Sequence, residues 1–266
     1  MNALETRMVN ILGELKGKHG AIGVKAEFET EGTRLEELLR LKEVCMKAQM
    51  KLVLKIGGCE SVRDMLESRV VGVDVLVAPM VETAYALRKY LQAVAKVFSP
   101  EELSTLEILT DVETAYAVNN FEAMLKIPEV KLLKGVVIER YDLMRSMGID
   151  DDNQLNAEKI NAVLAEVGAK AARQGLSVTV GGGVSSSSIA VFRNLKNLTR
   201  YETRKVCFDA QKALSGEPEK GIFKALGFEL FWLKNKLNFN KGINDSDMAR
   251  IKLIEDRYEQ TIKSLI

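Results

Sequence analysis

The chain has 266 residues, with 38 basic and 37 acidic side chains and a formal net charge of +1. This balance excludes the strongly basic surface on which nucleic-acid binding depends, so no nucleic-acid partner is expected. The apolar fraction of 47% is ordinary for a globular protein, and the apolar run at 70–81 is too short to cross a bilayer. We therefore expect no membrane partner. The length suits one (β/α)8 domain, which needs about 250 residues.

Cysteine and histidine usage narrows the chemistry. The three cysteines, Cys45, Cys59 and Cys207, are odd in number and widely spaced, which indicates reduced thiols and a cytoplasmic location. The first 20 residues mix charges and lack the apolar core of a signal peptide. His19 is the only histidine, so the sequence excludes a Cys/His zinc cluster and a Ser-His-Asp triad.

Apolar runs of strand length alternate with helical patterns along the chain, which predicts βαβ units and a parallel sheet. After an amphipathic helix over residues 1–18, the predicted strands lie near 22–29, 51–57, 73–79, 105–111, 134–141, 177–182 and 202–208. The clearest helices between them are predicted at 34–49, 82–98, 114–125, 157–174 and 187–195. Seven strands are one short of a closed barrel. The expected fold is therefore α/β, a (β/α)8 TIM-barrel-like domain over residues 1–209 that lacks a regular first strand.

From Lys212 onward the pattern is helical only. The first apolar stripe consists of Ile222, Leu226, Leu230 and Leu233, and the second of Ile251, Ile254, Tyr258 and Ile262. A loop is predicted between them at 238–242, where the sequence reads Asn-Phe-Asn-Lys-Gly. We expect residues 210–266 to form a C-terminal helical extension packed on the barrel or on a partner subunit, and the protein to be a homo-oligomer.

The hexapeptide Val-Glu-Thr-Ala-Tyr-Ala occurs twice, at 81–86 and 112–117, and each copy follows an apolar run. Glu82 and Glu113 therefore stand where successive strands end. In a parallel barrel this is the edge at which active sites are built. The alternative is that each glutamate only complements the dipole of the following helix.

Alternation in the first strand separates charged from apolar side chains. One face carries Val24, Ala26 and Phe28, and the other carries Lys25, Glu27 and Glu29. In a barrel covered by helices the apolar face packs outward, so the charged face should point inward. Lys55, on the second strand, is expected inside by the same argument. A half-solvated edge strand is the alternative explanation.

Carboxylates on several strand ends suit a hard divalent cation such as Mg²⁺ or Mn²⁺, which prefers oxygen ligands. A lysine beside such a site could stabilise an enolate oxygen or bind a substrate carboxylate. Lys55 is the candidate for this role, with a Schiff-base nucleophile as the second possibility. Neighbouring acids would raise the pKa of Lys55, which favours the first role.

The run Gly181-Gly182-Gly183 follows the sixth predicted strand and precedes four serines and an apolar helix. Glycines let backbone amides approach a ligand, and a helix N-terminus attracts anions. This pattern predicts an anion site, with a flexible turn before a capped helix as the alternative.

Two segments carry a resemblance to a known family. They are Leu109-Thr110-Asp111-Val112-Glu113-Thr114 and Val136-Val137-Ile138-Glu139-Arg140-Tyr141-Asp142-Leu143, the second ending at Ser146-Met147-Gly148. Residues 22–209 resemble the metal-dependent 2-keto-3-deoxy-acid aldolase and citrate lyase β-subunit family of the phosphoenolpyruvate/pyruvate barrel superfamily. The resemblance implies Mg²⁺ or Mn²⁺ on Glu113 and Asp142, and Lys55 in place of a substrate-binding arginine.

The resemblance also implies a function and its site residues. The expected protein is a cytoplasmic lyase or aldolase that acts on a small 2-oxo acid or acyl substrate through a pyruvate-like enolate. Lys55 would stabilise the enolate, Glu29 would orient a water at the metal, and Glu27 completes the acidic pair. Arg140 and the turn Gly181–Gly183 would bind the second anionic end of the substrate.

Besides Lys55, two segments depart from the family pattern. Thr30 follows the acidic pair where the family has a His or Asp for proton transfer, and Glu139-Arg140-Tyr141 replaces a Gly-Pro turn. These departures favour an alternative, a non-catalytic binding or assembly protein that has kept the barrel.

Overall fold

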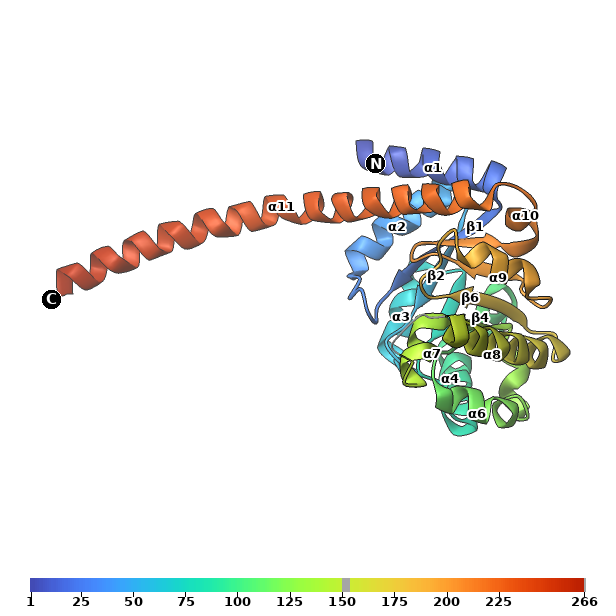
Figure 1. Ribbon diagram of the computed structural model, residues 1–266. Coiled ribbons are helices and arrows are strands. Elements are labelled where there is room, and N and C mark those ends of the chain that lie inside the picture. Colours follow the sequence, from blue (N-terminus) through green and yellow to red (C-terminus); the bar gives the residue numbers. More distant parts are fainter. Residues whose placement is uncertain (150–153, 266) are drawn as a thin grey trace.

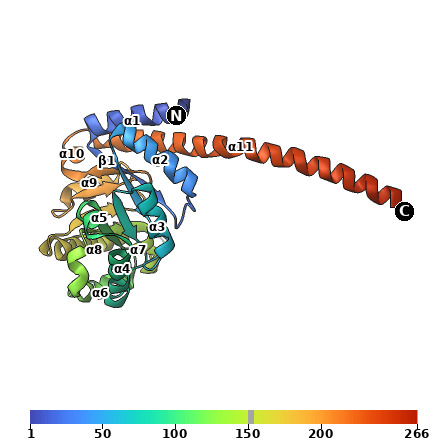
Figure 2. The same ribbon diagram turned by 180° about the vertical axis from the view of Figure 1, so that it is seen from behind.

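The computed structural model describes residues 1–149 and 154–265. Eight strands form a closed barrel with helices on its outside, and one very long helix extends away from it (Figure 1). The same arrangement is seen from behind in Figure 2, where the first helix and the last again lie side by side. Within the described ranges, no helix has the length and apolar character needed to cross a membrane.

The barrel strands follow one another around the barrel in chain order. They are β1 Ala21–Glu27, β2 Lys51–Lys55, β3 Val75–Ala78, β4 Glu107–Val112, β5 Gly135–Glu139, β6 Ser177–Gly181, β7 Arg200–Glu202 and β8 Val206–Asp209. Strands β1 to β7 pair in parallel, whereas β8 is antiparallel to both of its neighbours, β7 and β1. The carboxyl ends of seven strands therefore meet at one edge.

The helices cover the outside of this barrel (Figure 1). They are α1 Ala3–His19, α2 Leu35–Ala48, α3 Val62–Val71, α4 Ala84–Val97, α5 Pro100–Thr105, α6 Ala115–Met124, the 3-10 turn η1 Pro128–Leu132, α7 Arg140–Ser146, α8 Gln154–Arg173, α9 Ser188–Asn194, α10 Ala210–Ser215 and α11 Pro218–Leu265. The five helices predicted from the sequence are all present. Their ends fall within a few residues of the predicted ones.

Two expectations about the ends of the fold are wrong. The barrel does not lack an opening strand, because the strand predicted first is β1. The eighth strand is found at the other end, where the segment predicted as one strand at 202–208 contains parts of two, β7 and β8. The three residues between them, Thr203 to Lys205, reverse the chain direction, and β7 is too short and too polar to show a strand pattern. The predicted loop at 238–242 is also absent, because α11 continues through it. Asn and Gly cost a helix only about 0.7–1 kcal/mol each, which is too little to end it.

The interior of the barrel has an apolar layer and a charged layer. The apolar layer consists of Val53, Val75, Val77, Leu109, Val137 and Cys207. Val24 and Ala26 instead belong to the core between strands and helices, and Phe28 packs against that core. Lys25 and Glu27 are on the opposite face of β1 and are buried, so the predicted inward orientation of the charged residues is confirmed.

Candidate functional site

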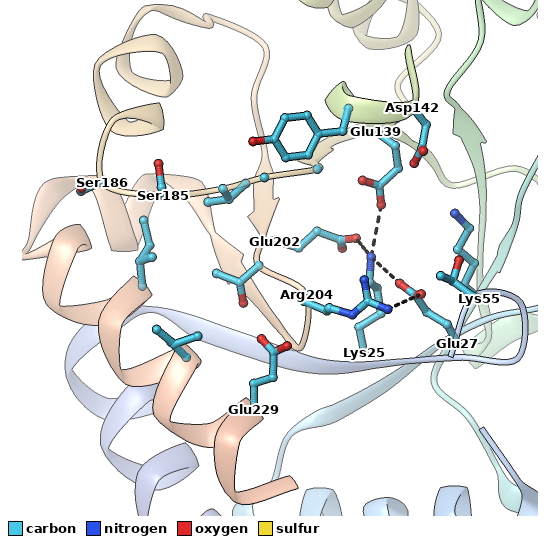
Figure 3. A pocket seen from close by; sticks show the side chains of 18 of the residues that line it. Lys25, Glu27, Lys55, Glu139, Asp142, Ser185, Ser186, Glu202, Arg204 and Glu229 are labelled. Atoms are coloured by element: carbon cyan, nitrogen blue, oxygen red, sulfur yellow. Dashed lines mark hydrogen bonds and ion pairs between the residues drawn. The ribbon is translucent and has the colours of Figure 1, made fainter. Parts of the chain in front are cut away.

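A cavity of about 740 Å³ lies at the carboxyl edge of the strands. Its floor is the charged layer of the barrel, and one wall is the loop after β6. The opposite wall is α11, which contributes Ile222, Phe223 and Leu226. Figure 3 shows Lys25, Glu27, Glu139 and Glu202 converging at the floor, with Glu229 of α11 across the opening. The site therefore combines a buried charged end with an apolar side.

Lys25, on β1, is the centre of one ionic cluster. Its ammonium nitrogen lies 3.2 Å from Glu27 Oε1, 3.2 Å from Glu139 Oε1 and 2.7 Å from Glu202 Oε1. These partners stand on β1, β5 and β7, so the cluster spans the barrel. Burial disfavours the charged form of Lys25, but the three carboxylates outweigh it and hold the lysine pKa well above its usual value.

Lys55, at the end of β2, is the centre of a second ionic cluster. Its ammonium nitrogen lies 3.0 Å from Glu29 Oε2, 2.8 Å from Asp111 Oδ2 and 3.2 Å from Glu113 Oε2. Burial again opposes the charge, and Asp111 and Glu113 raise the pKa of Lys55 far above that of a free lysine. This shift favours the charged form of Lys55 and disfavours the Schiff-base alternative, which needs a neutral amine.

Glu113 is fixed in place from two sides. Its Oε1 accepts a hydrogen bond from the backbone N–H of Met80 at 2.6 Å, while its Oε2 faces Lys55. Met80 has a φ of 54°, a left-handed conformation that is strained for a residue other than glycine. Such strain is characteristic of functional sites, and here it aims a backbone donor at the carboxylate.

The acids around Lys55 carry more negative charge than the lysine neutralises. Burial is the main reason that the pKa of Asp111 stands well above its usual value and that the pKa of Glu113 is also raised. The pKa of Asp142, in the first turn of α7, is raised by burial and by Glu139. Asp142 forms no hydrogen bond or ion pair with another residue of the described ranges. These acids can accept a further cation.

A divalent metal could bind here because the acids near Lys55 outnumber the lysine. Among residues 1–149 and 154–265, no three Asp, Glu, His or Cys side chains are gathered around one point as a ready-made metal site. Mg²⁺, however, often takes only one or two protein carboxylates and keeps several waters. Glu113 and Asp142 follow β4 and β5 at the same edge, and both have raised pKa values, so they fit a cation of this kind.

The glycine turn after β6 is required by its surroundings. Gly182 and Gly183 have φ values of 77° and 65°, and a Cβ at Gly183 would meet the Tyr141 ring at 1.9 Å. Both residues line the cavity together with Ser185 and Ser186, whereas Gly181 does not. The turn therefore brings backbone and hydroxyl groups to the cavity wall.

Arg140 does not line the cavity, where the sequence predicted it to bind substrate. Its guanidinium donates to Ser188 Oγ at 3.4 Å, and the residue is not part of the cavity lining. The arginines that do line the cavity are Arg145 and Arg204. The prediction of Arg140 as a substrate-binding residue is not supported by this position, and Arg145 and Arg204 take its place as candidates.

The repeated hexapeptide has a structural role that both copies share. Thr83 and Thr114 cap α4 and α6, accepting hydrogen bonds from Ala86 N at 3.1 Å and Ala117 N at 3.0 Å. Only the second copy contributes its glutamate to the ionic cluster of Lys55, since Glu82 is not among the partners of that lysine.

Sequence reasoning missed several residues of the cavity and of the ionic clusters. Glu202 stands on a three-residue strand that no pattern indicated. Glu139 has the same parity as Gly135 and Val137 on β5, so alternation could have placed it inside. Asp111 has the same parity as Glu113, and it is the nearest of the three carboxylates to Lys55.

The chain matches a known protein family. Residues 33–178 match a family model described as HpcH/HpaI aldolase/citrate lyase. No curated protein matches the chain. The fold is similar to the citrate synthase SbnG, with 14% identity, 88% of this chain and 90% of that chain covered, and a TM-score of 0.61.

Two further solved structures share the fold. A HpcH/HpaI aldolase/citrate lyase family protein from Burkholderia cenocepacia J2315 has 14% identity, covers 76% of this chain and 93% of its own, and gives a TM-score of 0.56. Macrophomate synthase has 13% identity, covers 88% of this chain and 90% of its own, and gives a TM-score of 0.52. At such identities the likeness shows the barrel fold alone.

Proposed function

Since the chain belongs to the HpcH/HpaI aldolase/citrate lyase family, we propose that it makes or breaks a carbon–carbon bond through a pyruvate-like enolate of a small acid. The observation that carries this proposal is the Lys55 ammonium, 2.8 to 3.2 Å from three carboxylates, inside the cavity at the carboxyl edge of the barrel. Active sites of such barrels are built at this edge.

Lys55 would stabilise the negative charge that develops on the substrate oxygen. A fixed positive group in a buried site acts more strongly than in water and needs no reorganisation when charge appears. Because the surrounding acids hold Lys55 protonated, its charge is present before the substrate arrives. Lys55 would therefore act through its electrostatic field, without forming a covalent bond.

Glu29 is the candidate for proton transfer. Its side chain is 30% exposed, so a substrate can reach it, and it lies 3.0 Å from the Lys55 ammonium. We propose that the Glu29 carboxylate accepts the proton from the carbon next to the carbonyl while Lys55 faces the carbonyl oxygen. Glu27 is bound to Lys25 at 3.2 Å and would maintain the shape of the floor.

Glu113 and Asp142 would hold a divalent cation, Mg²⁺ or Mn²⁺, as the family resemblance implies. When bound, such a cation polarises a carbonyl oxygen as a Lewis acid. Its charge would also offset the surplus of carboxylates around Lys55. The turn at Gly182–Gly183, with Arg145 and Arg204, would bind the other polar end of the substrate.

Solvent exchange of the methyl protons of pyruvate tests this proposal without knowledge of the second substrate. In deuterated buffer with Mn²⁺ or Mg²⁺, we expect deuterium to enter the methyl group, followed by proton NMR. Exchange requires only a base and enolate stabilisation. Repeating the reaction with EDTA measures how much of the exchange depends on the metal.

Lys55→Met is the variant that tests the assigned residue, and we expect exchange to fall by about 100-fold or more, the effect of losing one stabilising group at a developing oxyanion. Lys51→Met is the matched control, because Lys51 is on the same strand but at the opposite end of the barrel, where it pairs with Glu107 at 3.2 Å. Exchange that survives in Lys55→Met would contradict the role of Lys55. Absence of exchange in the wild-type protein with Mn²⁺ bound would favour the alternative, a non-catalytic binding or assembly protein.

A further inference from the structure

Helix α11 has two opposite apolar faces, of which the barrel covers one. Its covered face packs against α1 and consists of Ala225, Phe228 and Trp232, all buried. Polar contacts fix the same pairing, since Lys224 lies 2.9 Å from Glu14 and Asn235 Oδ1 accepts a hydrogen bond from Asn2 at 2.7 Å. These contacts hold the first half of α11 on α1 and the barrel.

The opposite face of α11 is a stripe of large apolar side chains open to solvent. The stripe consists of Phe223, Leu226, Leu230, Leu233 and Leu237, with exposures of 75%, 61%, 49%, 53% and 69%. The steps between them alternate between three and four residues, which is the heptad spacing of a coiled coil. Ile251 and Ile254 are also exposed, and they continue the same heptad register further along the helix. We call these seven residues the seam.

A seam of this kind needs a partner. A helix that is apolar on opposite faces is expected to be covered on both, and contiguous exposed apolar patches mark interaction sites. The second half of α11 extends away from the barrel in both views (Figures 1 and 2). An isolated helix gains little stability by itself in water, so packing along the seam would stabilise this extension.

We infer that the seam pairs with the seam of a second copy of this chain, as a parallel coiled coil in register. In that arrangement each apolar stretch, 223–237 and 251–254, meets its own copy. The sequence between the stretches, residues 238–250, is mostly polar or charged. An antiparallel pair would instead place one apolar stretch against polar residues or against the barrel of the partner.

The charges beside the seam support a second copy in this orientation. In a parallel pair, Glu229 would face the partner's Lys234, and Arg250 would face the partner's Glu255, because residues five apart meet across the seam. One contact, Lys236 with the partner's Lys241, joins like charges. Lys236 already lies 3.4 Å from Glu37 of its own chain, which reduces that repulsion.

Pairing would also change the cavity. Phe223 and Leu226 begin the seam and line the cavity, so the helix of the second copy would lie beside its open apolar wall. This inference concerns assembly and stands independently of the proposed reaction. Its tests measure molecular mass and disulfide cross-linking rather than activity.

Sedimentation equilibrium of the full chain tests the pairing. We expect the wild-type protein to have a mass at least twice that of the 29.6 kDa chain. We expect the double variant Leu230→Lys/Leu233→Lys to dissociate, with Kd weakened at least 100-fold. Phe239→Lys is the matched control, because Phe239 is 49% exposed on the same helix but off the seam, and it should keep the wild-type mass. Circular dichroism would verify that all three proteins are folded.

A single cysteine tests the orientation. In a Cys59→Ser background, Ile254→Cys should form an intermolecular disulfide on mild oxidation, since equivalent seam positions face each other in a parallel pair. Ala249→Cys, exposed on the far side of the helix, should not. A monomeric wild-type protein at 100 µM, about the upper range of weak assembly, would overturn the inference. So would a mass that the double variant does not lower, or equal cross-linking at the two cysteine positions.

Discussion

The barrel holds two buried lysines that each contact three carboxylates. Carboxyl groups beside the two lysines have pKa values shifted in opposite directions. Lys25 and Lys55 are each buried among three carboxylates within 3.2 Å. Near Lys25, the pKa of Glu27 is lowered: burial raises it, but the attraction and hydrogen bond of Lys25, together with the charges of Lys55 and Arg204, outweigh burial. Near Lys55, the pKa values of Asp111 and Glu113 are raised, because there burial outweighs the attraction of the lysine.

The difference comes mainly from burial and then from neighbouring acids. Asp111 is completely enclosed, and Glu113 and Glu139 raise its pKa further. The Lys25 cluster has a second cation beside its three carboxylates, since Arg204 lies 3.9 Å from Glu27. An ionic cluster with more cations stabilises the fold, whereas one with fewer can take up a cation or adjust its protons. We therefore propose a structural role for Lys25 and a chemical role for Lys55.

Removal of Lys25 should give the largest effect on stability. Lys25→Met leaves Glu27, Glu139 and Glu202 buried together without a cation, and we expect the free energy of unfolding to fall by about 3–5 kcal/mol, the usual cost of breaking a buried ion pair. Urea denaturation at pH 7.5 would measure it. Lys55→Met should cost less, because Asp111 and Glu113 take up protons more easily.

The control for Lys25 is an exposed ion pair. The Lys51 side chain is 52% exposed, and its contact with Glu107 should contribute no more than about 1 kcal/mol. Lys51→Met should therefore leave the urea midpoint nearly unchanged. Equal losses in Lys25→Met and Lys55→Met would remove the distinction between the two clusters.

Metal affinity should separate the two glutamates of the hexapeptide repeat. Glu113→Gln removes a proposed ligand charge, and we expect Mn²⁺ to bind at least tenfold more weakly, which is about 1.4 kcal/mol. Glu82→Gln should have little effect, because Glu82 is not among the carboxylates that contact Lys55. Isothermal titration with Mn²⁺ would compare them, and equal affinities would contradict the assignment of Glu113.

The sequence predicted those parts of the site that depend only on residues close together in the chain. Alternation over 24–29 placed Lys25 and Glu27 inside, because successive side chains on a strand point to opposite faces. The end of β4 was predicted from the repeat and from the family resemblance, which identified Glu113. These inferences need only the direction of one strand.

The sequence could not predict what depends on closure of the barrel. Lys25 meets Glu202 because β7 returns beside β1 through the reversed strand β8, and this arrangement has no local signal. Arg140 was misplaced because its side chain follows α7 toward α9, a direction set by the packing of two helices. The exposed seam of α11 was visible as two apolar stripes, but only the structure shows that one of its two apolar faces is open.

The smallest predicted effect is a difference in pH dependence between acids of the two clusters. A carboxyl group whose folded pKa is raised binds protons in the folded state before the unfolded chain does, so stability rises as pH falls toward the unfolded value. The folded pKa of Asp111 stands well above the usual aspartate value of 3.8, so wild-type stability should rise as pH falls toward that value, by at most about 1.4 kcal/mol per pH unit for one group.

Asp111→Asn should remove part of this rise, because asparagine cannot take up the proton. Glu27→Gln should retain it, since the folded pKa of Glu27 is lowered from 4.5; its contribution is present above that value and is lost only as pH falls further, through the folded pKa. Urea denaturation of the three proteins at pH 8, 6.5 and 5 would show the contrast. If Asp111→Asn gained as much stability as the wild-type protein on acidification, the surplus charge around Lys55 would not reside on Asp111, and Glu113 and Asp142 would have to carry it.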